Sequence, residues 1–515
     1  MAYERPGVYV KEAAFTTNIS NATGATPGAF IGLSARGPIT PVLVTTWSQY
    51  KNVFGNLENT YDLGYAVYHF FANGGQACYV TRVIDPTAVT AVSVVQGTPT
   101  GGSAATLWAL NAKSPGVWGN SLTINYVFDS DTLTTPTSAP MFNNASTFSM
   151  SVLLSGLEVE LWTGLSTDPS SNRFMTTILS LYSNYVSTSS VATVASGTPL
   201  AILGLDIADM DVSGTFASGT DGSESIDASS WAVAVEAHDL VKGSLLFNLV
   251  NQTSSTVINA TIATLTVRGD SFLIVDTPKT ATTKAALVSA VTSYTASSYA
   301  AVYGPALKMF DPTKTGAAAV RDTFCGGAVV GAFVRSEVER GVSKAPAGYG
   351  LDIRNVFGIV ANLTETEQGA LYKDQQLNTF TIVPGVGVII NGSRTLARNT
   401  KDKFVTVRRS LNFLKTTTKN ATTFALFEPN DERLWSTISV KLSAMLTTFW
   451  GTGGLKGNTA GDAFYVVCSS VNNTVTSIDD GIVNIEIGVA LQSPAEFIVI
   501  SISQWTGGST VTTSI

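Results

Sequence analysis

The chain has 515 residues and a formal net charge of −7, and only 13% of its residues are charged, against about 25% in ordinary soluble domains. The acidic balance argues against a general nucleic-acid binder, and no apolar run approaches the roughly 18 residues of a membrane helix. Three widely spaced cysteines without a C-x-x-C pair indicate buried thiols in a reducing compartment, and the first residues contain no apolar export signal. A chain with so few charged residues either has surfaces that protein neighbours cover, or is a β-rich protein whose surface is rich in Ser and Thr.

The first 25 residues are predicted to form an extended N-terminal arm. Gly7, Val8, Tyr9 and Val10 begin an alternating run, so the two valines present one face of a strand. Small and polar residues fill positions 16–26. A frayed terminus is the alternative, but it does not explain the alternation.

Two separated segments, residues 26–85 and 241–400, are predicted to form one α/β core. Short apolar strands alternate with helical stretches in both segments, an order that is typical of α/β domains. The expected strands are 29–32, 77–83 and 271–276, and the expected helices are 63–71, 283–294 and 322–339.

Residues 86–240 have a different composition. Between positions 86 and 230 there are 11 acidic and 2 basic residues, so this stretch carries a charge of −9 and the remainder of the chain +2. Alternating runs at 122–128 and 149–154 lie among turns rich in Gly, Ser and Thr. The pattern predicts an inserted, acidic, β-rich domain on the outer surface.

Residues 401–503 are predicted to form a C-terminal domain of helix and sheet. Apolar residues recur at three- and four-residue spacing from Leu434 to Phe449, behind Asn430 as the expected N-cap. From Val483 the period changes to two, and a second strand is expected at 498–502. Residues 504–515 then form a C-terminal arm, which ends in β-forming residues with no later strand to pair with.

No arrangement of residues indicates catalysis, a cofactor or a metal site. His69 and His238 lie far apart, and His69 is expected to be a packed residue of an apolar helix. The glycine-rich segment 451–457 contains a lysine but lacks the G-K-[ST] of a phosphate loop, so we expect a turn. Three aspartates between 206 and 211 miss the spacing of a calcium loop and indicate an exposed acidic loop.

One basic stretch runs from residue 394 to 419, and a solvated face is its default interpretation. DNA binding would require interleaved aromatics and a larger excess of charge. The alternative is contact with an acidic surface of a protein neighbour, where charge complementarity sets register more than affinity. The residues singled out for such contacts are Arg394, Lys403, Arg408 and Arg409.

Short motifs follow one another along the chain. They are PGVYVKE at 6–12, FEPND with LW at 427–435, GGLKG at 453–457, AFYVVC at 463–468, DDGIVNIEIGVA at 479–490 and PAEFIVISISQ at 494–504. In wording, order and spacing they resemble the contractile tail sheath proteins of phages and related injection machines. The resemblance covers roughly residues 1–85 and 270–510, although Ser343 and Asn391 stand where that family commonly has Trp.

The resemblance implies a non-enzymatic subunit, without cofactors, that polymerises helically around a tail tube and contracts to drive the tube through the host envelope. The implied partners are copies of itself, the tail tube protein, and the baseplate and tail terminator proteins, in a virion tail assembled in the host cytoplasm. Subunits of the family exchange strands, and the residues implied here are Gly7, Val8, Tyr9, Val10, Val511, Thr512, Thr513 and Ile515. The alternatives are the sheath of a related contractile injection system or tailocin, and a β-rich hydrolase.

Overall fold

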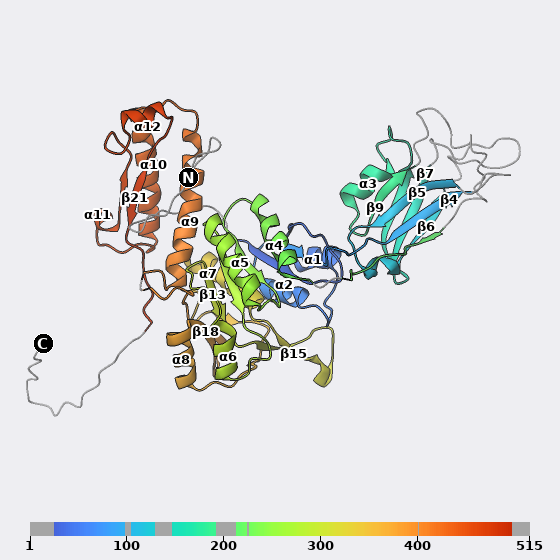
Figure 1. Ribbon diagram of the computed structural model, residues 1–515, viewed down its shortest axis with the longest axis horizontal. Helices are drawn as coiled ribbons and strands as arrows, with labels where there is room; N and C mark the ends of the chain where they lie inside the picture. The colour runs from blue at the N-terminus through green and yellow to red at the C-terminus, as the bar shows by residue number, and fades with distance from the viewer. Residues whose placement is uncertain are drawn as a thin grey trace, which may run out of the picture.

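The computed structural model describes residues 25–97, 105–128, 147–191, 213–223, 226–399 and 401–496. Figure 1 shows three bodies: an α/β core in the middle, a β-rich domain to one side and a C-terminal domain to the other. Both predicted arms, from Gly7 to Val10 and from Val511 to Ile515, lie outside the described residues, as does the strand predicted at 498–502. None of the helices in the described ranges combines the length and hydrophobicity that crossing a bilayer requires.

A mixed nine-stranded sheet forms the centre of the core, in the order β16-β19-β18-β13-β12-β11-β1-β3-β2. The strands are β1 (Gly28–Gly32), β2 (Val42–Val44), β3 (Cys78–Arg82), β11 (Leu246–Leu249), β12 (Phe272–Asp276), β13 (Ala300–Tyr303), β16 (Asp352–Ile353), β18 (Leu377–Val383) and β19 (Gly387–Asn391). Strands β18 to β3 in this order are parallel, and β2, β16 and β19 pair antiparallel at the edges. The central strands are buried throughout, as a parallel sheet covered by helices on both faces requires.

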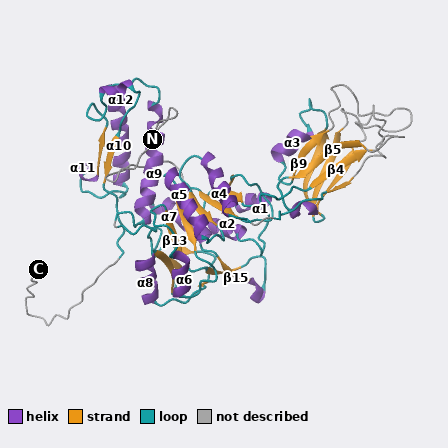
Figure 2. Cartoon of the chain, in the orientation of Figure 1, coloured by secondary structure: helices purple, strands orange, loops and turns teal. Residues whose placement is uncertain are grey.

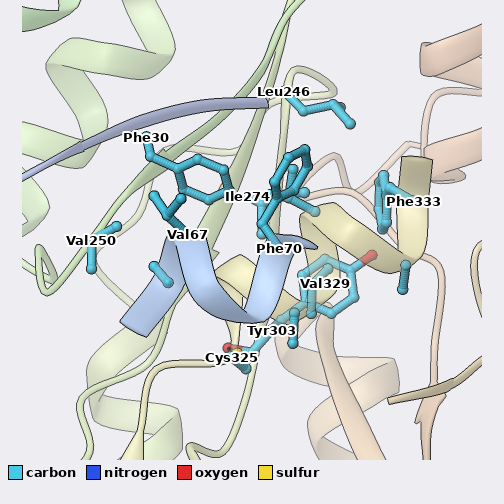
Figure 3. Packing of buried hydrophobic residues seen from close by; sticks show 14 of the residues in the cluster. Phe30, Val67, Phe70, Leu246, Val250, Ile274, Tyr303, Cys325, Val329 and Phe333 are labelled. Atoms are coloured by element: carbon cyan, nitrogen blue, oxygen red, sulfur yellow. Dashed lines mark hydrogen bonds between the residues drawn. The ribbon is translucent and has the colours of Figure 1, made fainter. Parts of the chain in front are cut away.

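Helices α2 and α7 cover one face of the sheet. The core helices are α1 (Trp47–Phe54), α2 (Leu63–Ala72), α4 (Ala228–Glu236), α5 (Ser255–Arg268), α6 (Lys284–Val291), α7 (Gly326–Arg340) and α8 (Glu365–Gln375). Phe30, Phe70 and Phe333 pack between α2, α7 and the sheet (Figure 3). Gly327 lets α7 approach α2 closely, because a Cβ there would lie 2.1 Å from the carbonyl oxygen of Ala66.

Helices α4, α5 and α6 cover the opposite face. Trp231 and Val235 of α4 are buried in the same cluster as Phe247 of β11, so α4 is part of the core by its packing. Helix α4 lies within the residues 86–240 that were expected to form the inserted domain, yet it packs with the core. A small sheet of β14 (Leu307–Phe310), β15 (Val320–Thr323) and β17 (Gly358–Ile359) completes the core, and because β15 occupies residues 320–323, α7 begins later than expected.

The inserted domain consists mainly of strands (Figure 2). It contains β4 (Val92–Gly97), β5 (Ala105–Ala112), β6 (Leu122–Phe128), β7 (Thr147–Leu154), β8 (Leu157–Ser166), α3 (Met175–Tyr182), β9 (Val186–Val191) and β10 (Ser213–Thr215). Its two sheets enclose a separate apolar cluster around Trp108 and Phe148. The chain enters and leaves at neighbouring points, because Val89 and Thr220 exchange backbone hydrogen bonds of 3.0 Å.

Two buried arginines join the inserted domain to the core. The guanidinium of Arg36 lies 4.2 Å from the ring centre of Tyr185 and donates to its hydroxyl and to the carbonyl of Lys51 in α1. Arg82 donates to the carbonyls of Ser34 at 2.7 Å and Pro115 at 2.6 Å. Each arginine thus donates to acceptors of both bodies, and this resists their separation, because separation would break those hydrogen bonds.

The C-terminal domain is built on two long helices. Its elements are α9 (Val405–Thr422), α10 (Glu432–Gly451), α11 (Ala460–Ala463), β20 (Phe464–Val467), α12 (Val475–Asp479) and β21 (Glu486–Val489). Helix α9 joins this domain to the core: Asn412 donates to the carbonyl of Ser271 at 2.8 Å, whereas Leu414 packs in the domain's own apolar cluster. The N-cap of α10 is Asp431, whose carboxylate accepts from the backbone of Leu434 at 2.9 Å, and not Asn430 as expected.

Candidate inter-subunit contact site

The C-terminal domain presents a two-stranded antiparallel sheet. Strands β20 and β21 pair from Phe464 opposite Val489 to Val467 opposite Glu486, and within the described part of the chain each belongs to a sheet of two strands. In the described residues, neither strand pairs with a third strand. A strand at the edge of a sheet is a template for a further strand.

The same sheet has an apolar face that α10 supports. Val466 and Ile487 pack against the cluster that contains Ile438, Leu442 and Phe449 of α10. The alternation predicted from Val483 is confirmed, because Val483, Ile485, Ile487 and Val489 all pack against this cluster. Because the helix fixes one face, a strand that joins either edge meets a rigid support.

Arg408 and Arg409, predicted to contact a neighbour or the tube, are buried inside the subunit at 4% side-chain exposure each. Arg409 forms an ion pair with Glu337 of α7, and its guanidinium lies 4.9 Å from the ring centre of Phe333. Arg408 lies 3.4 Å from the carboxylate of Asp402. This differs from the solvated or neighbour-facing position expected from sequence. The cause is that α9 docks its first turns onto the core, where both arginines meet acidic or aromatic groups.

Arg394 and Lys403 meet at a single carboxylate, that of Glu496. Arg394 holds it with two hydrogen bonds, from Nε at 2.8 Å and from Nη2 at 2.6 Å, and Lys403 lies 3.9 Å away. Tyr372 of α8 also donates its hydroxyl to Glu496. Burial raises the pKa of Glu496, but these hydrogen bonds and charges outweigh burial and hold that pKa below its usual value.

The two histidines and the three cysteines are packed in the interior. His69 is fully buried beside the sulfur of Met309, as predicted, and burial lowers its pKa to about 4. His238 is buried too, with a pKa lowered to about 4 by burial. The three cysteines are free and buried, in agreement with the sequence-based expectation. In the ranges that the structure describes, no group of three His, Cys, Asp or Glu side chains is arranged to hold a metal ion.

Sequence reasoning missed the acidic residues at these contacts. Glu337 lies 72 positions from Arg409, and Glu496 lies 102 positions from Arg394, so no local pattern relates the partners. The position of Glu496 within the PAEF motif could have indicated a basic partner, because a single acidic residue inside an apolar run is rarely buried without one.

Comparison with known proteins identifies this C-terminal region. Residues 398–504 match the family described as the phage tail sheath C-terminal domain. The chain is thus similar to tail sheath proteins over this C-terminal domain. The curated tail sheath proteins of Vibrio phage KVP40 and Enterobacteria phage T4 are 30% and 29% identical to it over 138 residues. That match covers 26% of this chain and about a fifth of each relative, 19% and 20%.

Solved sheath structures share the fold over nearly the whole chain. The sheath of an extracellular contractile injection system, PVC, in its contracted state gives a TM-score of 0.57 at 20% identity, covering 98% of this chain and 99% of that one. The contracted helical sheath of the anti-feeding prophage gives 0.56 at 17% identity, covering 98% and 100%. A sheath tail protein from Listeria innocua gives 0.59 at 12% identity, covering 92% and 96%. The predicted multidomain α/β sheath fold is confirmed.

Proposed function

We propose that this chain is the structural subunit of a contractile tail sheath, with a role in assembly and movement and none in catalysis. Copies polymerise helically around a tail tube, and contraction of the sheath drives the tube through the host envelope. The observation that carries the proposal is the β20–β21 sheet, which has two strands in the described residues and packs on the rigid helix α10. The sheath-family domain at residues 398–504 contains that sheet.

The polymer is held by strand exchange through the two terminal segments. The N-terminal segment contains Val8 and Val10, and the C-terminal one Val511, Thr513 and Ile515, each at alternate positions of a strand-like run. In this proposal the arms of neighbouring subunits pair with the outer edges of one β20–β21 sheet. Each backbone hydrogen bond adds about 1 kcal/mol net, and about half a dozen per arm stabilise a continuous lattice.

Contraction is a change in packing between subunits. Main-chain bonds of an exchanged strand constrain the rigid bodies they join less than a packed interface does, so subunits rotate while the lattice stays connected. Head-to-tail contacts that do not close on themselves generate a filament, as a cylinder around a tube requires. The partners are copies of this chain, a tube protein and the baseplate and terminator proteins at the ends, in a virion tail assembled in the host cytoplasm.

The sheath of a contractile injection system is the second candidate, since the contracted PVC sheath gives a TM-score of 0.57 over nearly the whole chain. The same experiment is the first test of both candidate functions. Negative-stain electron microscopy of the purified full-length chain should show hollow cylinders with a helical repeat. A chain that stays monomeric at every concentration and salt condition, while melting cooperatively, would contradict a sheath of either kind.

A further inference from the structure

The loop between α9 and α10 exposes an aromatic side chain. Phe427 is 89% exposed and has a φ of 67°, in the left-handed region that bulky residues rarely adopt. Asn430 holds this loop in place: its amide nitrogen donates to the carbonyl of Ile482 at 3.2 Å, and its amide oxygen accepts from the indole of Trp435 at 2.8 Å. Strained residues in loops that are held in place cluster at functional sites. We call residues 427–432 the tip.

The surroundings of the tip are acidic. The exposed acidic residues of the tip and of the segment just before Ile482 are Glu428, Asp431, Glu432, Asp479 and Asp480. The basic residues nearest in the chain are fewer, Lys419 in the last turn of α9 and Arg433 in the first turn of α10. An exposed ring beside a surplus of carboxylates fits a partner surface that is apolar at its centre and basic at its rim.

A groove of this kind lies where the C-terminal domain joins the core. It has a volume of about 480 Å³, within the range of about 300–1,000 Å³ that is usual for binding pockets. Three helices contribute apolar side chains to it: Val338 comes from α7, Phe413 from α9 and Phe449 from α10. We call it the junction groove, and its walls are rigid because they are helices packed on two apolar cores.

The rim of the junction groove is basic. Arg340 lines it, and Lys344 lies beside the turn that follows α10. Glu337 lines the groove as well, but an ion pair within the subunit neutralises its charge. Glu339 lies near Arg335, four residues earlier on α7. The charge of this rim is therefore opposite to that of the tip.

The tip and the junction groove lie at opposite ends of α10. This helix has 20 residues, from Glu432 beside the tip to Gly451, and Phe449 in its last turn lines the groove. At 1.5 Å per residue, about 30 Å of rigid helix separates the two surfaces. The tip of a chain therefore cannot enter the groove of the same chain. Contact between two different surfaces of identical copies is head-to-tail, and it repeats from one copy to the next.

We propose that the tip of one copy binds in the junction groove of the next copy. The ring of Phe427 packs among the apolar side chains of the groove, and the acidic residues of the tip face Arg340 and Lys344. This rests on the proposed function, in which copies polymerise, and it adds a second contact to the exchange of strands. A buried aromatic anchor surrounded by complementary charges is a common arrangement at the centre of an interface.

The first test removes the anchor. Asn adopts the left-handed conformation readily, so Phe427→Asn should fold like the parent chain and melt at the same temperature or above it. We expect the lowest protein concentration at which cylinders form to rise by about tenfold or more, as loss of an aromatic hot spot produces. Leu240→Asn, at an 88% exposed position of the core, should leave that concentration unchanged. Equal concentrations for Phe427→Asn and the parent chain would overturn the proposal in favour of a different partner for the tip.

The second test is cross-linking. The three native cysteines are buried, so a chain with Glu428→Cys and Val338→Cys carries one accessible thiol at the tip and one in the groove. A short bis-maleimide should join cylinders of this chain into a ladder of dimers, trimers and longer multimers, whereas neither single variant should exceed a dimer. Cylinders without a ladder would overturn the proposal.

The parent chain separates this proposal from the proposed function. If the parent forms no cylinders, the sheath function fails, and cross-linking of the double-cysteine chain in concentrated solution then tests the contact by itself. A ladder under those conditions would support the head-to-tail contact, and its absence would overturn it.

Discussion

Replacing Arg409 tests whether its charge serves the subunit or an interface. Arg409→Ala leaves Glu337 buried at 8% exposure without its cationic partner, and it removes the contact with the ring of Phe333. Breaking one partner of a buried ion pair costs about 3–5 kcal/mol, and loss of the cation–π contact adds about 0.5–2 kcal/mol. The residual hydrogen bonds from Thr26 reduce this loss but carry no compensating charge. We therefore expect the monomer to lose about 3 kcal/mol or more.

The assay is urea unfolding of the monomer, followed by a probe of the core, since a chain of several bodies need not unfold in one step. Arg398→Ala is the control, because Arg398 is exposed and lies near the same region of the chain. Equal midpoints for Arg409→Ala and Arg398→Ala would refute the reasoning. They would also favour the alternative expected from sequence, in which Arg408 and Arg409 contact an acidic surface of a protein neighbour.

Three further predictions concern other parts of the subunit. Burial lowers the pKa of His69 to about 4, so the folded protein resists protonation of this side chain. The stability that the neutral form contributes is complete above pH 6.5 and is lost as the pH falls from 6.5 towards 4, by up to about 3 kcal/mol. Thermal melts of His69→Gln should therefore show a shallower dependence of melting temperature on pH, and an identical dependence would contradict this. Leu442→Ala should cost about 2–5 kcal/mol in a calorimetric transition of the C-terminal domain, because Leu442 is fully buried in that domain's own cluster, and Val440→Ala on the exposed face is the control. Replacing residues 90–219 by a short linker should leave a core that folds and forms cylinders, because Val89 and Thr220 already pair at the base of the inserted domain. A folded core that forms no cylinders would contradict this prediction.

Local periodicity was enough to predict much of the fold. The apolar stripe from Leu434 to Phe449 and the alternation from Val483 both have their expected faces packed in the same cluster. Both could be predicted because helix and strand periods depend on neighbouring residues alone. The expected strand at 122–128 is β6. The N-cap of α10 shifted by one residue because Asn430 and Asp431 are both good caps, and Asn430 instead accepts from the indole nitrogen of Trp435 at 2.8 Å.

The pairing of distant charged residues was beyond what sequence could predict. The sequence around Arg408 and Arg409 shows which residues are basic. Whether these two side chains are buried depends on how α9 packs against α7, which is a property of the tertiary structure. Likewise, nothing in the local sequence of α4 separates it from the inserted domain, whereas its packing against β11 does. The predicted strand-exchange residues remain a prediction, because they lie outside the described residues.

The central claim, that this chain forms a sheath lattice through its two ends, is tested most directly by truncation. A chain that ends at Ser503 and a chain that lacks residues 1–17 keep every described element. Negative-stain electron microscopy beside a thermal melt should show that both stay folded, with the melting temperature of the parent chain, and that neither forms cylinders. Cylinders like those of the full-length chain from both truncated forms would contradict the account.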